Sequence, residues 1–442
     1  MAAGVALVAL ALAPAALAKS LVEAVETTIA SFPELLRDRS LDRAAEQQID
    51  RAFSRFLPTL DLDAASGYEY TDSPSTRGRK GAAERDAGGQ QLWRSDTSAV
   101  ARQLAFDGFG ALNRLRLARA ESRAASGLVY DTAERVGIRV VQVYLDVLRN
   151  REFVEFAEGN VTEHEVILAQ IKDLAQAGLG LGSDVDQAKA RLALARSGLE
   201  QRRGDLRQAR ARYTETVGEP PENLVRPAEP QYRIPQDMEA AVTEAIANHP
   251  AIRVTTATYQ ARLKQIKTIQ ARFYPRLDVE ASGSYNDNKD GVLGPDSDLN
   301  ARLRMRYNVL KGFGDLAAKR RSREQATAAL EDDNERRRQV REDVRVAYQA
   351  LITARERLAF LADHAEAEER VLTGYKEQFE LGRRSLLDVL DAQNELFQAR
   401  LALTDGDYRL LLAHFELMFT LGNLLQNLDV SVSAVQKRGT LD

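Results

Sequence analysis

The chain has 442 residues, a formal net charge of −4 and no cysteine. The lack of cysteine excludes a disulfide framework and thiolate metal sites. Charged residues of both signs make up 29% of the chain without a basic excess, which argues against a nucleic-acid-binding protein.

An apolar run opens the chain. Residues 4–18 end in Ala-Leu-Ala before Lys19, which is typical of a signal-peptide cleavage site. The run is too short to span a bilayer as a stable helix. No Lys or Arg precedes it, unlike in most signal peptides. We expect residues 1–18 to be a signal peptide with an irregular start, which implies an exported protein.

A helix and two strands are expected next. Residues 21–56 follow a helical pattern, and an alternation with period 2 then predicts a strand. One face of that strand takes every second residue: Leu60, Leu62, Ala64, Ser66, Tyr68 and Tyr70. We expect a polar loop over 71–95 and a noisier strand over 97–108, with Leu104 and Phe106 on one face.

A long helical hairpin completes the first half. Residues 110–177 contain no proline and carry apolar residues at helical spacing, so we expect one helix of about 100 Å. The glycine-rich residues 178–182 end it, as glycines do beyond a helix end. A return helix over 183–217 is expected to begin with a capping box formed by Ser183 and Asp186.

The proline-rich segment 219–237 is expected to be an irregular link, at the level of a belt around the helices. Beyond it, residues 277–285 and 299–309 alternate more cleanly than the first two strands. The strand over 299–309 has one apolar face and three arginines on the other. A membrane barrel strand needs an apolar lipid face and a polar lumen face, and about 10–12 residues fit a tilted one.

The two halves repeat each other. An offset of 217 residues relates Pro33 to Pro250, and an offset of 204 relates Gly178 to Gly382. The offset changes in the stretch after Tyr68, which predicts a longer surface loop there. A helix over 314–381 and a return helix from Ser385 match the helical hairpin of the first half.

These elements predict two repeats, 19–218 and 238–426, followed by a tail over 427–442. Each repeat holds a helix, a β-hairpin and a helical hairpin: about 58–108 and 110–217 in the first repeat, about 275–310 and 314–425 in the second. Each return helix is about half the length of its long partner, so we expect a pre-strand helix stacked end to end with it. Four membrane strands cannot close a barrel, whereas three chains would supply 12.

Several motifs resemble the TolC-like outer membrane efflux proteins along nearly the whole length after residue 18. They are AVETTIASFPELL and AVTEAIANHPAI, FLPTLDLDAASGY and FYPRLDVEASGSY, the two GFG turns, and LGRRSLLDVLDA at 381–392. The resemblance implies a mainly α fold with membrane β-strands, the TolC-like channel-tunnel. Four strands per chain would contribute to a 12-stranded trimeric barrel that continues as a long α-helical periplasmic barrel.

The resemblance also implies location and partners. We expect a homotrimer in the outer membrane of a Gram-negative bacterium, in contact with outer membrane lipid and extending into the periplasm. Its partners would be a periplasmic adaptor protein and an inner-membrane ABC transporter or other pump. It would perform no chemistry and hold no cofactor or metal.

The resemblance places a periplasmic gate at the tip of the second helical hairpin. Asp388 and Asp391 share a helix face, and three copies of each would form an acidic ring, although Asp388 also suits a helix cap. Arg384 lies where the family ties the closed tip by charge pairing, with a solvated turn arginine as the alternative. Asp184 matches Asp388, but its neighbour Gln187 argues against a second full ring.

Two further sets of residues are expected to have roles, the first by the resemblance and the second by the alternating strand pattern. The hairpin tips would dock the adaptor through Gly178, Leu179, Gly180, Gly382 and Arg383. The barrel lumen would be lined by Arg302, Arg304 and Arg306, as solvated charges and not as specific ligands.

Three functions remain open at this point. The tip motif and the short tail most resemble the branch that exports large adhesin-like proteins by type I secretion. The same duct would also suit small-molecule or drug efflux. An exported coiled-coil scaffold without a pore is a third possibility, and the four alternating strands count against it. The four histidines lack metal-ligand spacing, and no carboxylate pairs with a nucleophile, so an enzyme is not indicated.

Overall fold

The computed structural model describes residues 19–73, 76, 89–178, 180–230, 232 and 234–432. They form two compact units, which are described separately. The helical unit holds residues up to 39, 127–253 and those from 335 onward, and the sheet unit holds 40–126 and 254–334. Several parts of the sequence predictions lie outside the described residues: the signal peptide 1–18, most of the polar loop expected over 71–95, Leu179, and residues 433–442 of the tail.

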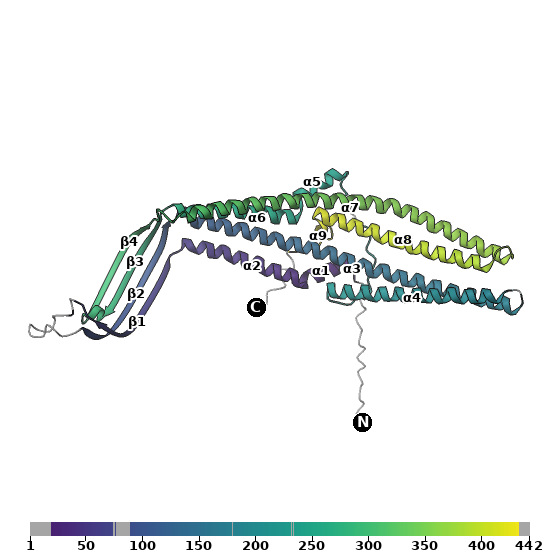
Figure 1. The fold of residues 1–442 in the computed structure, drawn as a ribbon, viewed down its shortest axis with the longest axis horizontal. Helices are drawn as coiled ribbons and strands as arrows, with labels where there is room; N and C mark the ends of the chain where they lie inside the picture. The colour runs from purple at the N-terminus through teal and green to yellow at the C-terminus, as the bar shows by residue number, and fades with distance from the viewer. Residues whose placement is uncertain are drawn as a thin grey trace, which may run out of the picture. The chain divides into compact units, whose positions relative to one another are not determined.

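The sheet unit contains one antiparallel sheet of four strands in the order β1-β2-β3-β4 (Figure 1). Its strands are β1 (Thr59–Thr71), β2 (Gln90–Phe106), β3 (Arg276–Asp287) and β4 (Pro295–Arg306). Each half of the chain supplies one hairpin, and the pairing of β2 with β3 joins the two halves. Strands β1 and β4 are therefore the two edges of the sheet within one chain.

Strand β2 is longer than the sequence predicts. It begins at Gln90, whereas the pattern indicated a loop as far as 95 and a strand from about 97. The additional residues pair with β1, and Trp93 lies opposite Tyr68 with the two ring centroids 4.9 Å apart in an edge-on contact. Such a cross-strand pair contributes about 0.2–1 kcal/mol. The segment's own polar composition gives no sign of this pairing.

A register shift near the end of β2 corrects a second expectation. Leu104 pairs with Asp278 and Phe106 pairs with Leu277, so one residue of β2 bulges out between them. Residues opposite each other share a face, and consecutive residues of β3 point to opposite faces. Leu104 and Phe106 therefore lie on opposite faces, and the expectation that they share one is wrong.

The two faces of the sheet differ in chemistry. One face exposes large apolar side chains on every strand, with Leu299 reaching 89% exposure. Its main members are Leu60, Leu62, Tyr68, Trp93, Val279, Leu299, Leu303 and Met305. The opposite face carries arginines and carboxylates, of which Asp278 and Glu280 are buried. An exposed apolar face of this size marks a surface that contacts another apolar phase or partner.

A tight turn leads from each hairpin into a long helix. In the first turn, Gly108 and Phe109 both have positive φ, and the N–H of Gly110 donates to the carbonyl of Asp107 at 3.2 Å. Two successive residues with positive φ and this hydrogen bond define a type I′ turn. Residues 311–314 repeat the same geometry in the second half.

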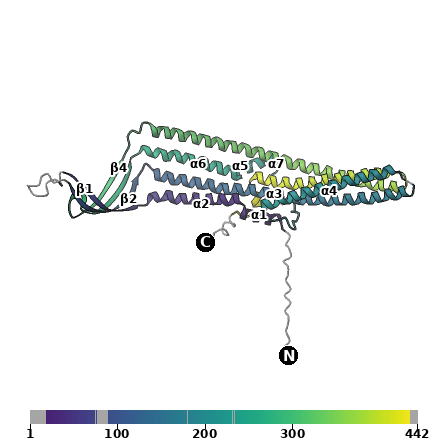
Figure 2. The ribbon, with the colours of Figure 1, turned by 60° about the horizontal axis from the view of Figure 1, so that its bottom comes forward.

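The helices come in pairs of equal length, one from each half (Figure 2). The pairs are α1 (Leu21–Ser31) with α5 (Met238–Asn248), α2 (Pro33–Phe53) with α6 (Pro250–Gln270), α3 (Gly110–Gln176) with α7 (Gly314–Glu380), and α4 (Gly182–Val217) with α8 (Leu386–Leu421). Helices α3 and α7 have 67 residues each, and a short helix α9 (Leu424–Asn427) follows α8. Within the described ranges, no helix has the length and apolarity needed to cross a membrane.

Apolar clusters hold the helical unit together. In the largest, Ile29 of α1 packs with Tyr144 and Leu148 of α3 and with Phe415 of α8. A second cluster joins α3, α4, α7 and α8, and a third joins α5 to α7 and α8. Full burial of one such large side chain contributes about 1.5–3 kcal/mol.

The proline-rich link is fixed to this core by hydrogen bonds. The buried hydroxyl of Tyr144 lies 2.6 Å from the carbonyl oxygen of Val225 and accepts the N–H of the same residue at 3.1 Å. Lys19 at the start of the described chain donates its N–H to Asn223 at 3.2 Å. Further along, Glu229 lies 2.8 Å from Nε2 of the buried His414 in α8. The link is thus held by side chains of α3 and α8 and by the backbone of Lys19, which precedes α1.

Candidate functional site

The turn between α7 and α8 is a glycine-capped helix end. Gly382 has a φ of +69°, its N–H donates to Phe379, and the N–H of Arg383 donates to Gln378. This pair of bonds is the Schellman motif, which satisfies the last carbonyls of a helix and favours glycine at the left-handed position. The turn fixes the positions of Arg383 and Arg384, which precede the N-cap residue Ser385 of α8.

Asp388 closes the capping box at the start of α8. The hydroxyl of Ser385 accepts the N–H of Asp388 at 3.2 Å, and Oδ2 of Asp388 accepts the N–H of Ser385 at 3.1 Å. The predicted capping role is therefore confirmed. Its other oxygen, Oδ1, lies 3.9 Å from the Arg384 guanidinium, and the side chain is still 42% exposed.

Asp391 lies one turn further along α8 and pairs with the other hairpin. Its Oδ1 accepts a hydrogen bond at 2.7 Å from Arg191 of α4. A second ion pair joins the hairpins, in which Lys376 of α7 lies 3.3 Å from Glu163 of α3. Neither pair has a signal in the sequence, because the partners are far apart in the chain and do not follow the repeat offset.

Arg384 is held by its own hairpin. Its guanidinium carbon lies 3.9 Å from the centroid of the Tyr375 ring, and its Nε donates to Gln378 at 3.1 Å. A guanidinium over an aromatic ring contributes about 0.5–1 kcal/mol at exposed sites. Arg384 is thus a positioned side chain, and the alternative of a fully solvated turn arginine does not describe it.

The first hairpin tip is built differently. Gly178 has a φ of +76°, and α4 begins at Gly182 with Leu181 as a cap residue that makes no side-chain hydrogen bond. The expected capping box of Ser183 and Asp186 is therefore wrong, because Ser183 already lies inside the helix. Asp186 pairs instead with Lys189 at 2.9 Å.

The two tips share one apolar core. Ile167 and Ile171 of α3, Leu192 of α4 and Leu390 of α8 belong to the same buried cluster. The structure therefore brings Asp388, Asp391 and Arg384 together at one tip and places Asp184 in the first turn of α4. Arg191 and Tyr375 are contact residues that sequence reasoning missed.

The three arginines of β4 lie on the polar face of the sheet and neutralise buried carboxylates. Arg302 and Arg304 lie 3.1 Å and 3.2 Å from the two oxygens of Glu280, and Arg306 lies 3.0 Å from Asp278. These residues occupy paired positions on β3 and β4, so their side chains share one face. The result is a charged ladder across the sheet.

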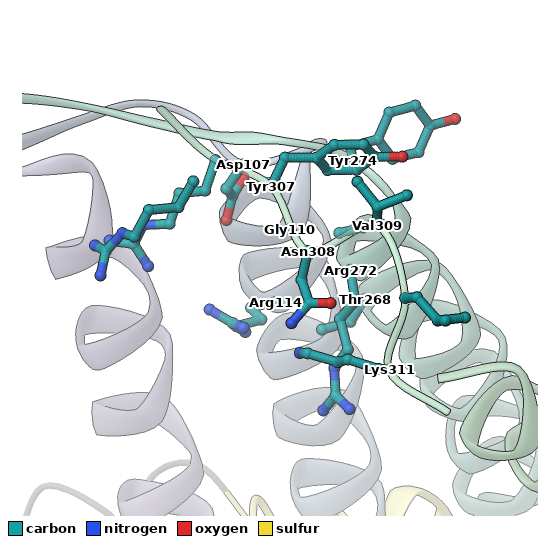
Figure 3. Close-up of a pocket in the computed structure, with 14 residues that line it drawn as sticks. Asp107, Gly110, Arg114, Thr268, Arg272, Tyr274, Tyr307, Asn308, Val309 and Lys311 are labelled. Carbon is teal, nitrogen blue, oxygen red and sulfur yellow. The ribbon is translucent and has the colours of Figure 1, made fainter. Parts of the chain in front are cut away.

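A cavity of about 970 Å³ lies where the strands end, within the sheet unit (Figure 3). Its lining includes five cationic side chains and one carboxylate, that of Asp107. The cations are Arg114, Arg272, Arg276, Arg306 and Lys311. No cluster of three or more His, Asp or Glu side chains that could hold a metal ion is found in the described part of the chain.

Comparison with known proteins decides the family. The profile of the outer membrane efflux protein family matches residues 24–219 and 241–423, which correspond to the two repeats. The chain belongs to the outer membrane efflux protein family. As a member of this family, it is an outer membrane protein with an efflux-channel fold, and the predicted channel-tunnel fold is confirmed.

Individual members of the outer membrane efflux protein family show how far the similarity extends. The chain is 27% identical to the outer membrane efflux protein BepC of Brucella suis biovar 1 (strain 1330), over 73% of this chain and 71% of that protein. It is 23% identical to the outer membrane protein TolC of Escherichia coli (strain K12), over 92% and 83% of the two chains. The structure of the Campylobacter jejuni CmeC outer membrane channel superposes with a TM-score of 0.78 at 13% identity. The match covers 96% of this chain and 90% of the CmeC chain.

Proposed function

We propose that three copies of this chain form the outer membrane duct of a tripartite export system. The observation that carries the proposal is the four-stranded sheet, which has two open edges and an exposed apolar face. An open edge cannot face lipid, because its N–H and C=O groups would have no partners. Barrels of this kind start at about eight strands, so several copies must contribute. Three copies give 12 strands, in line with the resemblance to the TolC-like proteins.

The helices would continue this barrel as a tunnel in the periplasm. Their surfaces are largely charged, and α4 and α8 lie against the long helices through the apolar cluster at the tips. A water-filled tunnel needs polar walls, and a passive duct needs no reactive group. The proposed protein is therefore a conduit and not an enzyme.

The gate is proposed at the hairpin tips. Asp388 and Asp391 are both partly exposed near the start of α8, and three copies of each would form an acidic ring that attracts cations. Arg384, stacked on Tyr375, would set the position of the turn beside this ring. Asp184 would add a charge from the first hairpin.

Contacts with partners are proposed at the same end. The periplasmic adaptor would dock on the two turns, through Gly178, Leu179, Gly180, Gly382 and Arg383. The described turn residues in this set are exposed, which suits a docking surface. In the sheet unit, Arg302, Arg304 and Arg306 would face the barrel lumen.

The proposed cargo is protein delivered by an inner-membrane ABC transporter, in the manner of type I secretion of large adhesins. The tip motif LGRRSLLDVLDA supports this branch by resemblance. The second candidate is a small-molecule efflux duct. It is supported by membership of the outer membrane efflux protein family and by the similarity to BepC, an outer membrane efflux protein.

A deletion strain separates the two candidates. If the cargo is protein, loss of the gene removes large proteins from the cell surface and the medium, while drug susceptibility changes little. A strain that becomes drug-sensitive with unchanged surface and secreted proteins would contradict type I secretion and favour the efflux duct. Complementation with the intact gene controls for effects on neighbouring genes.

A further inference from the structure

The cavity at the strand ends has a feature that transport does not require: an apolar rim around a cationic interior. Its rim carries two tyrosines and two aliphatic residues of the connections between helices and strands. Their exposed fractions are Tyr274 57%, Tyr307 52%, Val309 82% and Leu310 73%. Aromatic residues at the ends of membrane strands mark the depth of lipid headgroups. The cavity therefore opens at headgroup depth.

The interior of the cavity has an excess of positive charge. Asp278 compensates Arg276 and Arg306 at 2.9 Å and 3.0 Å. Asp315 lies 3.4 Å from Arg272 and 3.8 Å from Lys311, so a single carboxylate serves both of these cations. The cavity thus has more cationic side chains than carboxylates that pair with them.

Arg114 is the central member of the set. It projects from the second turn of α3, and among the described residues its side chain makes no hydrogen bond or ion pair. Burial lowers the pKa of Arg114, and the positive charges of Arg55, Arg272 and Arg276 lower it further, against an opposing effect of Asp107. A guanidinium crowded by other cations gains most from a bound anion. Figure 3 shows it beside the cavity with Arg272 and Lys311.

We propose that this cavity binds the phosphate headgroup of an anionic phospholipid. Arg114, Arg272 and Lys311, which lie on helices and on a connection and not on the polar face of the sheet, would hold the phosphate, for which guanidinium groups provide paired N–H donors. The rim of tyrosine and aliphatic side chains would lie along the acyl chains. Basic pockets at the membrane surface recognise lipid headgroups in this way. The inference depends on the outer membrane location of the family and not on the proposed cargo.

The test uses the purified full-length protein, stripped of lipid in detergent. Native mass spectrometry would compare the retention of dioleoyl-phosphatidylglycerol with that of dioleoyl-phosphatidylcholine. We expect selective retention of phosphatidylglycerol and a loss of its affinity by about fivefold in the Arg114→Gln variant, the usual effect of one basic residue near a lipid surface. The matched control is Arg119→Gln, an exposed arginine of the same helix that does not line the cavity. It should bind as the unaltered protein does.

Other results decide against the proposal. Equal retention of both lipids, or equal losses in Arg114→Gln and Arg119→Gln, would show that the cavity does not select an anionic headgroup. Inorganic phosphate should compete only weakly with phosphatidylglycerol, because it lacks the acyl chains that contact the rim. Competition at equal concentrations of the two would contradict a lipid occupant. If Arg114→Gln fails to assemble, the Lys311→Gln variant replaces it in the test, since Lys311 lies on an irregular connection. Lys311→Gln should also lower the affinity for phosphatidylglycerol by about fivefold.

Discussion

At the scale of single residues, charge is used in two different ways. Asp391 and Arg191 form an exposed pair, and such pairs contribute only about 0.2–1 kcal/mol to stability. Glu134 on α3 is buried and accepts the backbone N–H groups of Leu424 and Leu425 at 3.1 Å and 3.3 Å. Exposed charges can thus be altered with little effect on folding, whereas a buried one cannot.

The acidic-ring proposal predicts a change of ion selectivity. In the Asp391→Asn variant we expect a clear fall in cation preference, because each assembly loses three negative charges at its narrow end. The free energy of unfolding should change by less than about 1 kcal/mol. Reversal potentials in planar bilayers under a salt gradient measure the effect. Asp186→Asn, which also removes an exposed paired carboxylate near a tip, is the control, and an equal shift in both variants would contradict the ring.

The buried carboxylate predicts a pH dependence of stability. Burial raises the pKa of Glu134 from 4.5 to about 7, although the two N–H groups that it accepts oppose the shift. The folded protein therefore binds a proton more tightly than the unfolded chain. This contribution is complete below about pH 4.5 and is lost as the pH rises through about 7, by about 3 kcal/mol in all.

Glu134→Gln isolates that contribution. Glutamine keeps an oxygen that accepts the N–H groups, so the variant should lose less stability than the unaltered protein between pH 5 and 8. Apparent unfolding midpoints across this range measure the difference. Glu155→Gln, at an exposed position of the same helix, should leave the pH profile unchanged. Parallel profiles for Glu134→Gln and the unaltered protein would show that the carboxylate does not titrate there.

The charged ladder of the sheet predicts that removing a carboxylate and removing an arginine shift ion selectivity in opposite directions. Glu280→Gln leaves Arg302 and Arg304 without their carboxylate and should move selectivity toward anions. Arg304→Gln should move it toward cations, because the ladder then carries one positive charge fewer beside Glu280. The same bilayer recordings measure both. If neither variant changes the reversal potential, the polar face of the sheet does not line the conducting path.

At the scale of elements, the duplicated sequence explains most of the fold, because α1 to α4 match α5 to α8 in length. Strands β3 and β4 were predictable, since apolar and polar residues alternate cleanly along each of them. The start of β2 was not, because Trp93 and its neighbours are ordered by pairing with β1 and not by their own pattern. The tip residues Asp388 and Gly382 follow from local capping rules, whereas the contact of Asp391 with Arg191 depends on packing between distant helices.

The glycines of α7 and of the turn after it allow a matched test. Gly374 lies inside the helix, and no atom lies within 4 Å of the position that an added methyl group would take, so Gly374→Ala should stabilise the protein by about 0.5–1 kcal/mol. Gly382 has equally open surroundings but a φ of +69°, so Gly382→Ala should destabilise it by about 1 kcal/mol. Denaturant unfolding measures both. Changes of the same sign would contradict the proposed role of the left-handed turn.

At the scale of the whole molecule, one chain is an incomplete channel. Its sheet ends at β1 and β4, and large apolar side chains such as Leu299 and Leu62 are exposed on one face. Closure of the barrel by further copies would pair both edges, and lipid would cover the apolar face.

The native mass of the protein extracted from outer membranes tests this account most directly. Native mass spectrometry in detergent should give three chains per particle, with a single species that dissociates only on heating. A particle of one chain, or a stable assembly of any other number, would contradict the 12-stranded barrel and with it the proposed duct.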